Sequence, residues 1–570
     1  MSTSLSSPSG VDVDTGRLDG ASRLRIFTVL AVIVLYTEIA PLQFTMVGAA
    51  LQKMAKSFPT VGANINWAVI ILGLIGASAT PLLGKASDIW GKKKLFLLCG
   101  VLFLIGCLID ALTTNWTLFL IGRGLQALAI ASQFISYGLI RDLLPRKYIP
   151  LSLGIVGAGL GFSGVIAPFI SGVLIDHFDW PAMFWFLGAF TLVLTPLVIA
   201  VVPESPLRVK QRIDPFGAVM LSGGALLILL YLDNGQTWGW TRPSALAYVI
   251  AGVALLVGFF VVELRVAQPI MDMKLLLNPK VSIVLLMTFF GIGLTAVQPV
   301  ALGYMSQTPD QDHLRDSVVD GVVTQTHQMT GQTLPASLVK VAFDPGYTYG
   351  NGFSMVQYAV HLGIWAGVMG MIVGPLAGAL TRRIGARTPA IIGLALLAVA
   401  ALGYTFASYS WPVYLLISAI GGIAFGFVYA AVPNLIVEAV PAEQQGISTG
   451  MLGVVQNIGT SAAVAVMTAM LNANPVKAHL DVAGHRSEQV IPQVFADHGY
   501  HTSFVFVLVT TIIGLIIALF MRHGRTPTTG GAAGDNLIAD AGAGAGDGIV
   551  AVGDTPATTR TGTEEAPATA

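Results

Sequence analysis

The stretch PLLGKASDIWGKKKLF, residues 81–96, lies between two apolar runs and decides how the rest of the chain is interpreted. Gly84, Asp88 and Gly91 follow one another at fixed offsets, and three consecutive lysines begin at Lys92. Glycine permits close backbone approach because it has no side chain, and lysines beside membrane helices are retained on the cytoplasmic side. The stretch therefore predicts a tight cytoplasmic turn, opened by Gly84, between two membrane-spanning helices.

The composition is that of a polytopic membrane protein. Of 570 residues, 54% are hydrophobic and 11% are charged, whereas roughly a quarter of a soluble domain is charged. The formal net charge is zero, which gives no electrostatic support for binding nucleic acid. Cys99 and Cys107 are separated by about 12 Å of helical rise, so no disulfide is expected between them. No cleavable signal peptide is expected, because the first apolar segment is too long for one.

Fourteen apolar segments are each near the ~20 residues that cross a bilayer. An even number places both termini on one side, and most lysines and arginines outside the segments fall in the loops of that side, which predicts cytoplasmic termini. The segments are 26–51, 65–83, 95–113, 116–140, 151–175 and 182–202, an inserted pair at 215–232 and 244–263, and then 281–305, 353–380, 388–408, 411–434, 446–470 and 502–521.

An internal repeat divides these segments into two sets of six. The pattern of residues 84–94 returns, weakened, at residues 378–387, and residues 139–154 match residues 435–450. Such parallel repeats imply two halves related by an axis along the membrane normal, with a substrate site near the midplane between them.

The spacing of Gly84, Asp88, Gly91 and the lysines resembles the signature between helices 2 and 3 of the major facilitator superfamily of secondary transporters. The inserted pair resembles that of its 14-helix drug:proton antiporter branch, and the resemblance covers roughly residues 25–522. It implies an all-α membrane protein of the major facilitator fold, with two six-helix halves and two inserted helices. We expect a disordered tail at 1–24, halves at 25–205 and 276–522, the inserted pair at 206–275, and a disordered tail at 523–570.

Three ionisable side chains fall deep inside the segments: Glu38, Arg123 and His361. Counting helical rise from the segment ends places all three at about 18–21 Å from the inner edge, so we expect them to face one cavity. Arg123 and Gln126 resemble the R-x-x-Q-G motif of proton-coupled members, which implies that the arginine acts with an acid of the first segment. Gln43 stands where that branch carries the acid, so Glu38 is the nearest candidate. The alternative is a static ion pair between Glu38 and Arg123.

Further motifs carry expected roles. The resemblance implies that Asp88 pairs with Arg141 and caps the helix that begins near Gln445, so that the motif set latches the cytoplasmic face; a plain turn-capping aspartate is the alternative. Residues 151–175 resemble an antiporter motif around Gly164, Pro168 and Gly172, for which close helix packing is the other interpretation. The expected conformational set is Gly84, Asp88, Gly91, Lys92, Lys93 and Arg141.

Polar side chains near mid-depth are candidates for contact with substrate, although such groups often bond to one another across helices. They are Gln43, Gln126, His361, Gln456 and Asn457. Asp176, His177 and Asp179 form too weak a pattern for a metal site. No phosphate-binding loop occurs and no soluble domain is present, so neither an enzyme activity nor a cofactor is expected.

These features favour a multi-pass transporter of a bacterial cytoplasmic membrane that exports lipophilic or cationic compounds in exchange for protons, as in multidrug resistance. One alternative is an ion-coupled importer or a lipid or metabolite translocator on the same fold. Another is a non-transporting scaffold or sensor that uses the polar loop 306–352 to dock an extracytoplasmic partner. That loop is long enough for an adaptor or lid, but an unstructured insertion is the more common case.

Overall fold

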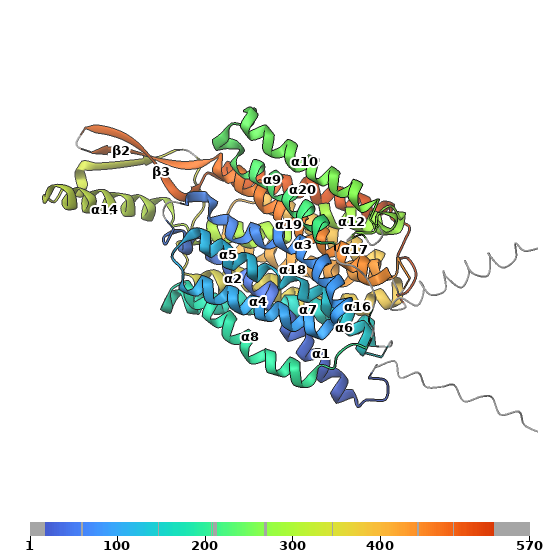
Figure 1. Ribbon diagram of the computed structural model, residues 1–570. Coiled ribbons are helices and arrows are strands. Elements are labelled where there is room, and N and C mark those ends of the chain that lie inside the picture. Colours follow the sequence, from blue (N-terminus) through green and yellow to red (C-terminus); the bar gives the residue numbers. More distant parts are fainter. Residues whose placement is uncertain are drawn as a thin grey trace, which may run out of the picture.

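A computed structural model describes residues 18–528, apart from 59–60, 146–147, 207, 209–213, 267–268, 270, 345, 442–443 and 483. Figure 1 shows a bundle of long helices lying side by side, from which an arm of one helix and a small sheet projects at one end. We call this end of the bundle the arm end, and the opposite end, where α1 begins and α20 finishes, the terminal end.

Thirteen helical segments in the described part of the chain are long and apolar enough to cross a membrane, and α9 holds a shorter apolar stretch, Phe216–Leu232. Every segment expected from the sequence overlaps one of these helices. The first half contains α1 (Arg23–Thr37), α2 (Ile39–Ala55), α3 (Trp67–Trp90), α4 (Lys92–Leu112), α5 (Trp116–Ala127), α6 (Ile130–Leu143), α7 (Ile149–Phe178) and α8 (Pro181–Val201). The inserted pair is α9 (Pro215–Trp238) and α10 (Pro243–Glu263). The second half contains α12 (Pro279–Gly291), α13 (Gly293–Gln307), α15 (Met355–Tyr358), α16 (Ile364–Ile384), α17 (Arg387–Phe406), α18 (Trp411–Val437), α19 (Gln445–Asn472) and α20 (Asp497–Phe520).

Several of the spans are interrupted along their length. α1 and α2 meet at Glu38, because Pro41 lacks the N–H that would bond the carbonyl of Thr37. α5 and α6 are separated by residues 128–129, and α12 and α13 by Ile292. α15 runs into α16 through a wider π-type turn, Ala359–Gly363. Interrupted membrane helices are tolerated where protein or a cavity covers the freed backbone groups.

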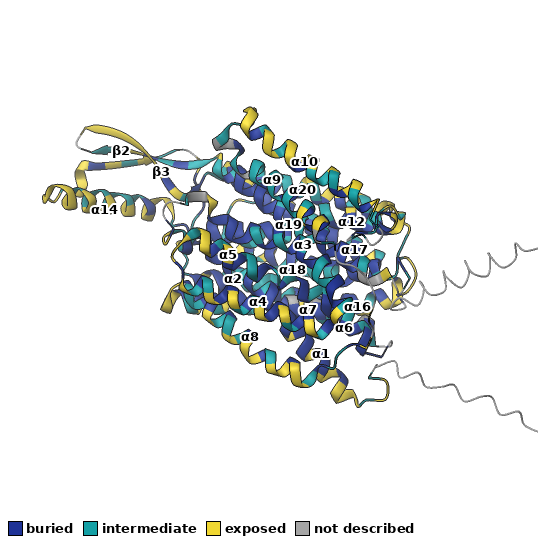
Figure 2. Cartoon of the chain, in the orientation of Figure 1, coloured by how far each residue is buried: buried dark blue, intermediate teal, exposed yellow. Residues whose placement is uncertain are grey.

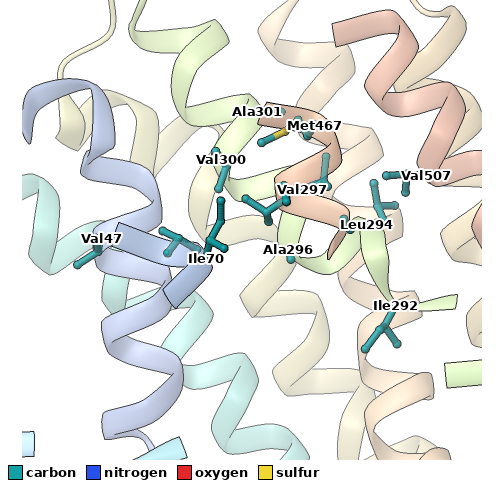
Figure 3. Close-up of a cluster of buried hydrophobic side chains, with 14 of the residues drawn as sticks. Val47, Ile70, Ile292, Leu294, Ala296, Val297, Val300, Ala301, Met467 and Val507 are labelled. Atoms are coloured by element: carbon teal, nitrogen blue, oxygen red, sulfur yellow. The ribbon is translucent and has the colours of Figure 1, made fainter. Parts of the chain in front are cut away.

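The two halves pack through small and apolar side chains. Gly161 and Gly164 of α7 lie against α16, where a Cβ added at Gly164 would come within 2.9 Å of the Cα of Gly367. Figure 3 shows part of the apolar core, in which Ile70 of the first half lies near Val300 of the second, and a Cβ added at Gly48 of α2 would lie 3.8 Å from Val300. α9 contacts both α3 and α19, so the inserted pair covers the junction between the halves.

The outer faces of the bundle are apolar. Leu192 and Val193 on α8, and Ile250 and Val257 on α10, are among the exposed large hydrophobic side chains, and Figure 2 shows exposed residues along the outside of both helices. Exposed apolar surface of this extent fits contact with lipid.

The arm is built from two separate loops. α14 (Gln311–Thr330) and β1 (Val339–Phe343) come from the loop after α13, whereas β2 (Pro475–Val482) and β3 (His485–Phe495) follow α19. The strands form an antiparallel sheet in the order β1-β2-β3, with Val341 opposite Leu480. The expectation of an unstructured insertion at 306–352 is therefore wrong. Its strand finds a partner far along the chain, which a local reading of the loop misses.

The expected disordered tails lie mostly outside the described residues, which begin at 18 and end at 528. Described residues of both flanks are bonded to the bundle. The Leu18 N–H donates to the carbonyl of Leu143 (2.8 Å), and the carbonyl of Gly524 accepts from the Arg387 N–H (2.9 Å).

Candidate functional site

A cavity of about 250 Å³ lies between the two halves of the bundle. Its walls are mainly apolar and aromatic, and none of its described lining residues carries a charge. Amides and hydroxyls from both halves interrupt the apolar surface: Thr45, Gln133, Thr295, Gln298, Ser418, Gln456, Asn457 and Thr460. A mostly apolar pocket with a few placed polar groups is typical of small-molecule sites.

Some polar groups of the cavity are bonded to one another. The Gln298 side chain donates to the Ser418 hydroxyl (3.2 Å), and Asn457 donates to the hydroxyl of Thr80 (3.4 Å). Gln456 has no such partner among the described side chains, although its carbonyl accepts from Thr460 (2.8 Å). Of the five predicted cavity residues, Gln456 and Asn457 line the cavity and the other three do not.

Glu38 sits at the break between α1 and α2 and is 1% exposed. Its carboxylate accepts a short hydrogen bond from the Ser163 hydroxyl of α7. Gly159, one turn earlier on α7, leaves room for the carboxylate, because a Cβ there would collide with it. Ala40 and Pro41, two and three residues further along the chain, line the cavity. Glu38 is therefore a buried acid beside the cavity with a neutral partner.

Arg123 is fully buried in a different cluster. Its Nε donates to the carbonyl of Ala68 (2.9 Å), and its Nη1 donates to the Gln126 side-chain oxygen at 2.5 Å. The amide nitrogen of Gln126 in turn donates to Asp110 Oδ2 (2.9 Å). Gln43 joins the cluster by donating to the Gln126 backbone carbonyl (3.1 Å).

The expected pairing of Glu38 with Arg123 is not present. In the described structure no ion pair joins them, because Glu38 turns towards α7 while Arg123 faces α3 and α4. The carboxylate near Arg123 is Asp110 of α4, which sequence reasoning missed. A lone aspartate in the apolar run 95–113 is the pattern that points to it.

His361 lies away from both clusters. It stands in the π-type turn, stacks on Phe353 with ring centroids 4.8 Å apart, and meets Trp411 edge-on at 4.7 Å. Its Nδ1 is 2.8 Å from the carbonyl of Gln357. The expectation that Glu38, Arg123 and His361 share one cavity is therefore wrong. Equal depth does not place side chains on the same face.

The motif of residues 84–94 lies at the terminal end. α3 continues through Gly84 to Trp90, so the turn lies at Gly91, whose φ of 121° suits glycine, rather than at Gly84. The amide N–H of Lys93 donates to Glu204 (2.9 Å), which caps the start of α4.

The expected ion pair of Asp88 with Arg141 is replaced by another arrangement. Asp88 pairs with Lys92 (2.6 Å), and Lys92 is also 2.9 Å from Asp142, which Arg141 contacts at 3.1 Å. The side chain of Gln444, the residue before α19, makes no capping hydrogen bond. The expected cap by Asp88 falls at residues 445–446, whose side-chain surroundings lie outside the described part of the structure. Asp88 and Arg141 instead line a second cavity between α3, α6, α18 and α19.

Hydrogen bonds join the two halves at the arm end. Asn66 donates to Thr468 (3.0 Å) and accepts from Tyr304 (2.9 Å). Asp176 accepts from the backbone N–H of Val356 at the start of α15 (3.1 Å). These bonds close the bundle at its arm end. At the terminal end, the second cavity lies between the halves.

Known families and structures resemble this chain. The family model for the Major Facilitator Superfamily matches residues 34–312 and 332–553. The chain belongs to the Major Facilitator Superfamily. Among solved structures, the xylose transporter XylE from E. coli, in a partially occluded inward open conformation, matches with a TM-score of 0.55 and 12% identity, covering 88% of this chain and 98% of that one.

Relatives within the superfamily include MFS-type transporters and a multidrug resistance protein. The uncharacterized MFS-type transporter YfiU of Bacillus subtilis is 26% identical over 477 residues, 80% of this chain and 83% of the relative. Multidrug resistance protein 3 of the same organism is 28% identical over 203 residues, 35% of this chain and 39% of the relative. The chain spans about half the length of some other curated relatives that it matches.

The glycine-rich helix α7 has a clear packing role in this major facilitator protein. A Cβ at Gly172 would come within 2.9 Å of the Cα of Val356, and one at Gly363 would meet Pro168 at 2.9 Å. Gly164, Pro168 and Gly172 thus allow α7 to approach α15 and α16 closely, which is the packing interpretation of that motif.

Proposed function

We propose that this protein is a proton-coupled exporter of lipophilic or cationic small molecules, working by alternating access in a bacterial cytoplasmic membrane. On this proposal the terminal end faces the cytoplasm, in line with the distribution of lysine and arginine, and the arm end faces outside. A relative named as a multidrug resistance protein supports export. The uncharged, largely apolar cavity supports a lipophilic substrate.

The observation that supports proton coupling is the burial of the Glu38 carboxyl beside the cavity. A carboxyl buried in the membrane interior is costly when charged unless it is paired, and the partner of Glu38 is a neutral hydroxyl. Protonation removes that cost. Because Glu38 lies at a helix break two residues before the cavity residue Ala40, a change in its charge can alter how α2 packs against the substrate.

The test uses inverted vesicles, acidic inside, with ethidium as the probe. Wild type is expected to accumulate the dye and to lose this accumulation when a protonophore is added. Glu38→Gln is expected to lower gradient-driven accumulation at least about tenfold, the effect of roughly 1.4 kcal/mol, while ethidium exchange without a gradient persists. Asp312→Asn, an exposed acid on α14, is the matched control and keeps wild-type activity. Unchanged gradient-driven transport by Glu38→Gln contradicts the assignment.

The same assay distinguishes export from the alternative of ion-coupled import. Ethidium moving in the same direction as protons would favour an ion-coupled importer or translocator on this fold. The folded arm is the one observation that favours a docking or sensing function, and its removal is considered below.

A further inference from the structure

We infer that Asp110, with Gln126 and Arg123, forms a second proton-binding site, separate from Glu38 and close to the arm end of the first half. This inference rests on the proposed proton coupling. Asp110 is 0% exposed and lies two residues before the end of α4, about 3 Å of helical rise. The site is thus buried, yet near one surface of the bundle.

The geometry differs from that of a direct ion pair. The Gln126 side chain lies between the charged groups, accepting from Arg123 and donating to Asp110 Oδ2. Asp110 Oδ1 and Arg123 Nη2 are both buried without a hydrogen-bond partner in the described structure. A buried pair that only locks two helices is favourable when its contact is direct and its remaining atoms are satisfied. Here one carboxylate oxygen is left free to take up a proton.

Few other titratable groups face Asp110. Arg123 lies on α5. Cys107 lies on α4, as Asp110 does, and its sulfur is 3.6 Å from the side-chain amide nitrogen of Gln126. α8 contains no titratable side chain. Lys85 and Asp88 of α3, and the titratable residues of α6, lie towards the opposite end of their helices. The charge state of Asp110 is therefore governed mainly by Arg123 and by exclusion of water.

Aromatic rings separate the cluster from the arm end. On α5, Trp116 and Phe119 precede Arg123, and their rings stack at 5.5 Å. Phe58 and Trp180 pack on Phe119 at 5.5 and 5.9 Å, while Phe184 lies 5.8 Å from the guanidinium of Arg123. Proton exchange with the arm side therefore requires these rings to move, which ties occupancy of the site to conformation.

The chemical step is a simple protonation. Asp110 Oδ1 takes a proton from a hydronium ion: one O–H bond of hydronium breaks and leaves water, one O–H bond forms on the carboxyl, and the charge of the cluster changes from zero to plus one. The same bond breaks when the proton leaves. An uncompensated buried guanidinium is costly, so the protonated cluster favours a conformation in which Arg123 is better solvated.

The test compares Asp110→Asn with the double variant Asp110→Asn/Arg123→Gln in ethidium-loaded proteoliposomes. Both are expected to keep gradient-independent ethidium exchange and to lose gradient-driven transport about tenfold or more. The double variant removes the uncompensated charge, so it keeps the comparison valid if the single variant folds poorly.

The outcomes separate the two proposals. Recovery of driven transport in the double variant would mean a structural ion pair and would overturn the inference. A parallel loss of exchange and driven transport in the double variant would overturn it as well, as would a gradient response by Asp110→Asn equal to that of wild type. A wild type that ignores the proton gradient would instead defeat the proposed function on which the inference depends.

Discussion

Glu38 and Asp110 are both buried carboxyls of the first half, but their surroundings differ. Glu38 meets a neutral hydroxyl on α7, whereas Asp110 meets the amide of Gln126 and, beyond it, the cation of Arg123. Neutralising Glu38 leaves no unpaired charge behind, but neutralising Asp110 leaves a buried guanidinium without its counter-charge. The two sites are therefore expected to respond differently to the same kind of substitution.

The space around Asp110 gives a prediction about packing. A Cβ added at Gly122 would collide with Asp110 Oδ1, so Gly122→Ala overpacks the contact between α4 and α5. We expect a loss of about 1–3 kcal/mol in the free energy of unfolding, seen as a lower melting temperature in detergent. Gly188→Ala is the control, because its new Cβ would lie an ordinary 3.7 Å from Cys107. Equal melting temperatures for the two variants would argue against the tight contact.

The arm is the element that stands apart from the transport machinery. The ends of its first loop are already joined, since the N–H of Gly352 donates to the carbonyl of Thr308 (2.9 Å). The ends of the second loop meet where the Ala496 N–H donates to the carbonyl of Asn474 (2.8 Å). Each arm loop thus leaves and re-enters the bundle at one point, where a backbone hydrogen bond joins its two ends; we call these two points the closed bases of the arm.

Excising the arm tests the scaffold alternative. Replacing residues 312–342 and 476–493 by short Gly-Ser linkers is expected to leave ethidium export within about twofold of wild type, because the closed bases keep the helices in place and short flexible loops cost little entropy. Export is measured in vesicles, with membrane insertion checked by proteolysis from each side. Loss of export by a correctly inserted variant would give the arm a part in transport.

The stability of the first turn of α14 is expected to depend on pH. The backbone N–H of His313 donates to Asp310 (2.9 Å), and its Nδ1 lies 2.8 Å from the same oxygen. These bonds hold the pKa of Asp310 below its ordinary value, and Asp310 raises the pKa of His313. The contribution of Asp310 is lost as pH falls through its lowered pKa, and that of His313 is lost as pH rises through its raised pKa.

Both contributions are complete between the ordinary pKa values of aspartate and histidine, about pH 4 to 6.5. We expect slower amide hydrogen exchange in the first turn of α14 at pH 5.5 than at pH 8.5, after correction for intrinsic rates. Asp310→Asn keeps a capping oxygen but removes the charge, so the difference should disappear. Equal corrected protection of wild type at the two pH values would refute this role for the pair.

Helices and strands were predictable from the sequence where neighbouring residues alone determine them. The spans follow from apolar runs of bilayer length, and their bounds differ from expectation by several residues at most ends, as for α3, which continues through Gly84 to Trp90. The arm could not be foreseen, because β1 pairs with β2 more than a hundred residues later. Helical rise predicts a depth for Arg123 but not the direction of its side chain, so the cluster with Gln126 and Asp110 could not be foreseen.

At the scale of the whole molecule, polar contacts join the two halves at the arm end, and one of them involves a carboxylate. Asp176 accepts from the backbone N–H groups of Met355 and Val356 (3.3 and 3.1 Å), which begin a helix of the other half. A carboxylate at a helix N-terminus is stabilising. This contact is therefore expected to contribute to keeping the arm end closed, beside the bonds of Asn66 to Thr468 and Tyr304.

Removing that contact should shift the conformation. Asp176→Ala is expected to raise labelling of a cysteine introduced at the cavity residue Thr45 by a membrane-impermeant maleimide added from the arm side. Asp179→Ala is the control, since the Asp179 carboxylate bonds only the neighbouring Trp180 N–H (2.7 Å) among the described side-chain contacts. The native Cys99 and Cys107 are buried. If Asp176→Ala labels no faster than the control, this contact does not hold the arm end closed.

The most direct test of proton-coupled export follows protons rather than dye. Sealed proteoliposomes of known orientation, with no initial pH gradient and a pH-sensitive dye inside, receive an inward ethidium gradient. The account predicts that ethidium entry drives protons out, so that the interior becomes alkaline in wild type and stays unchanged in Glu38→Gln. Ethidium entry in wild type with no change in internal pH, or with acidification, would contradict it.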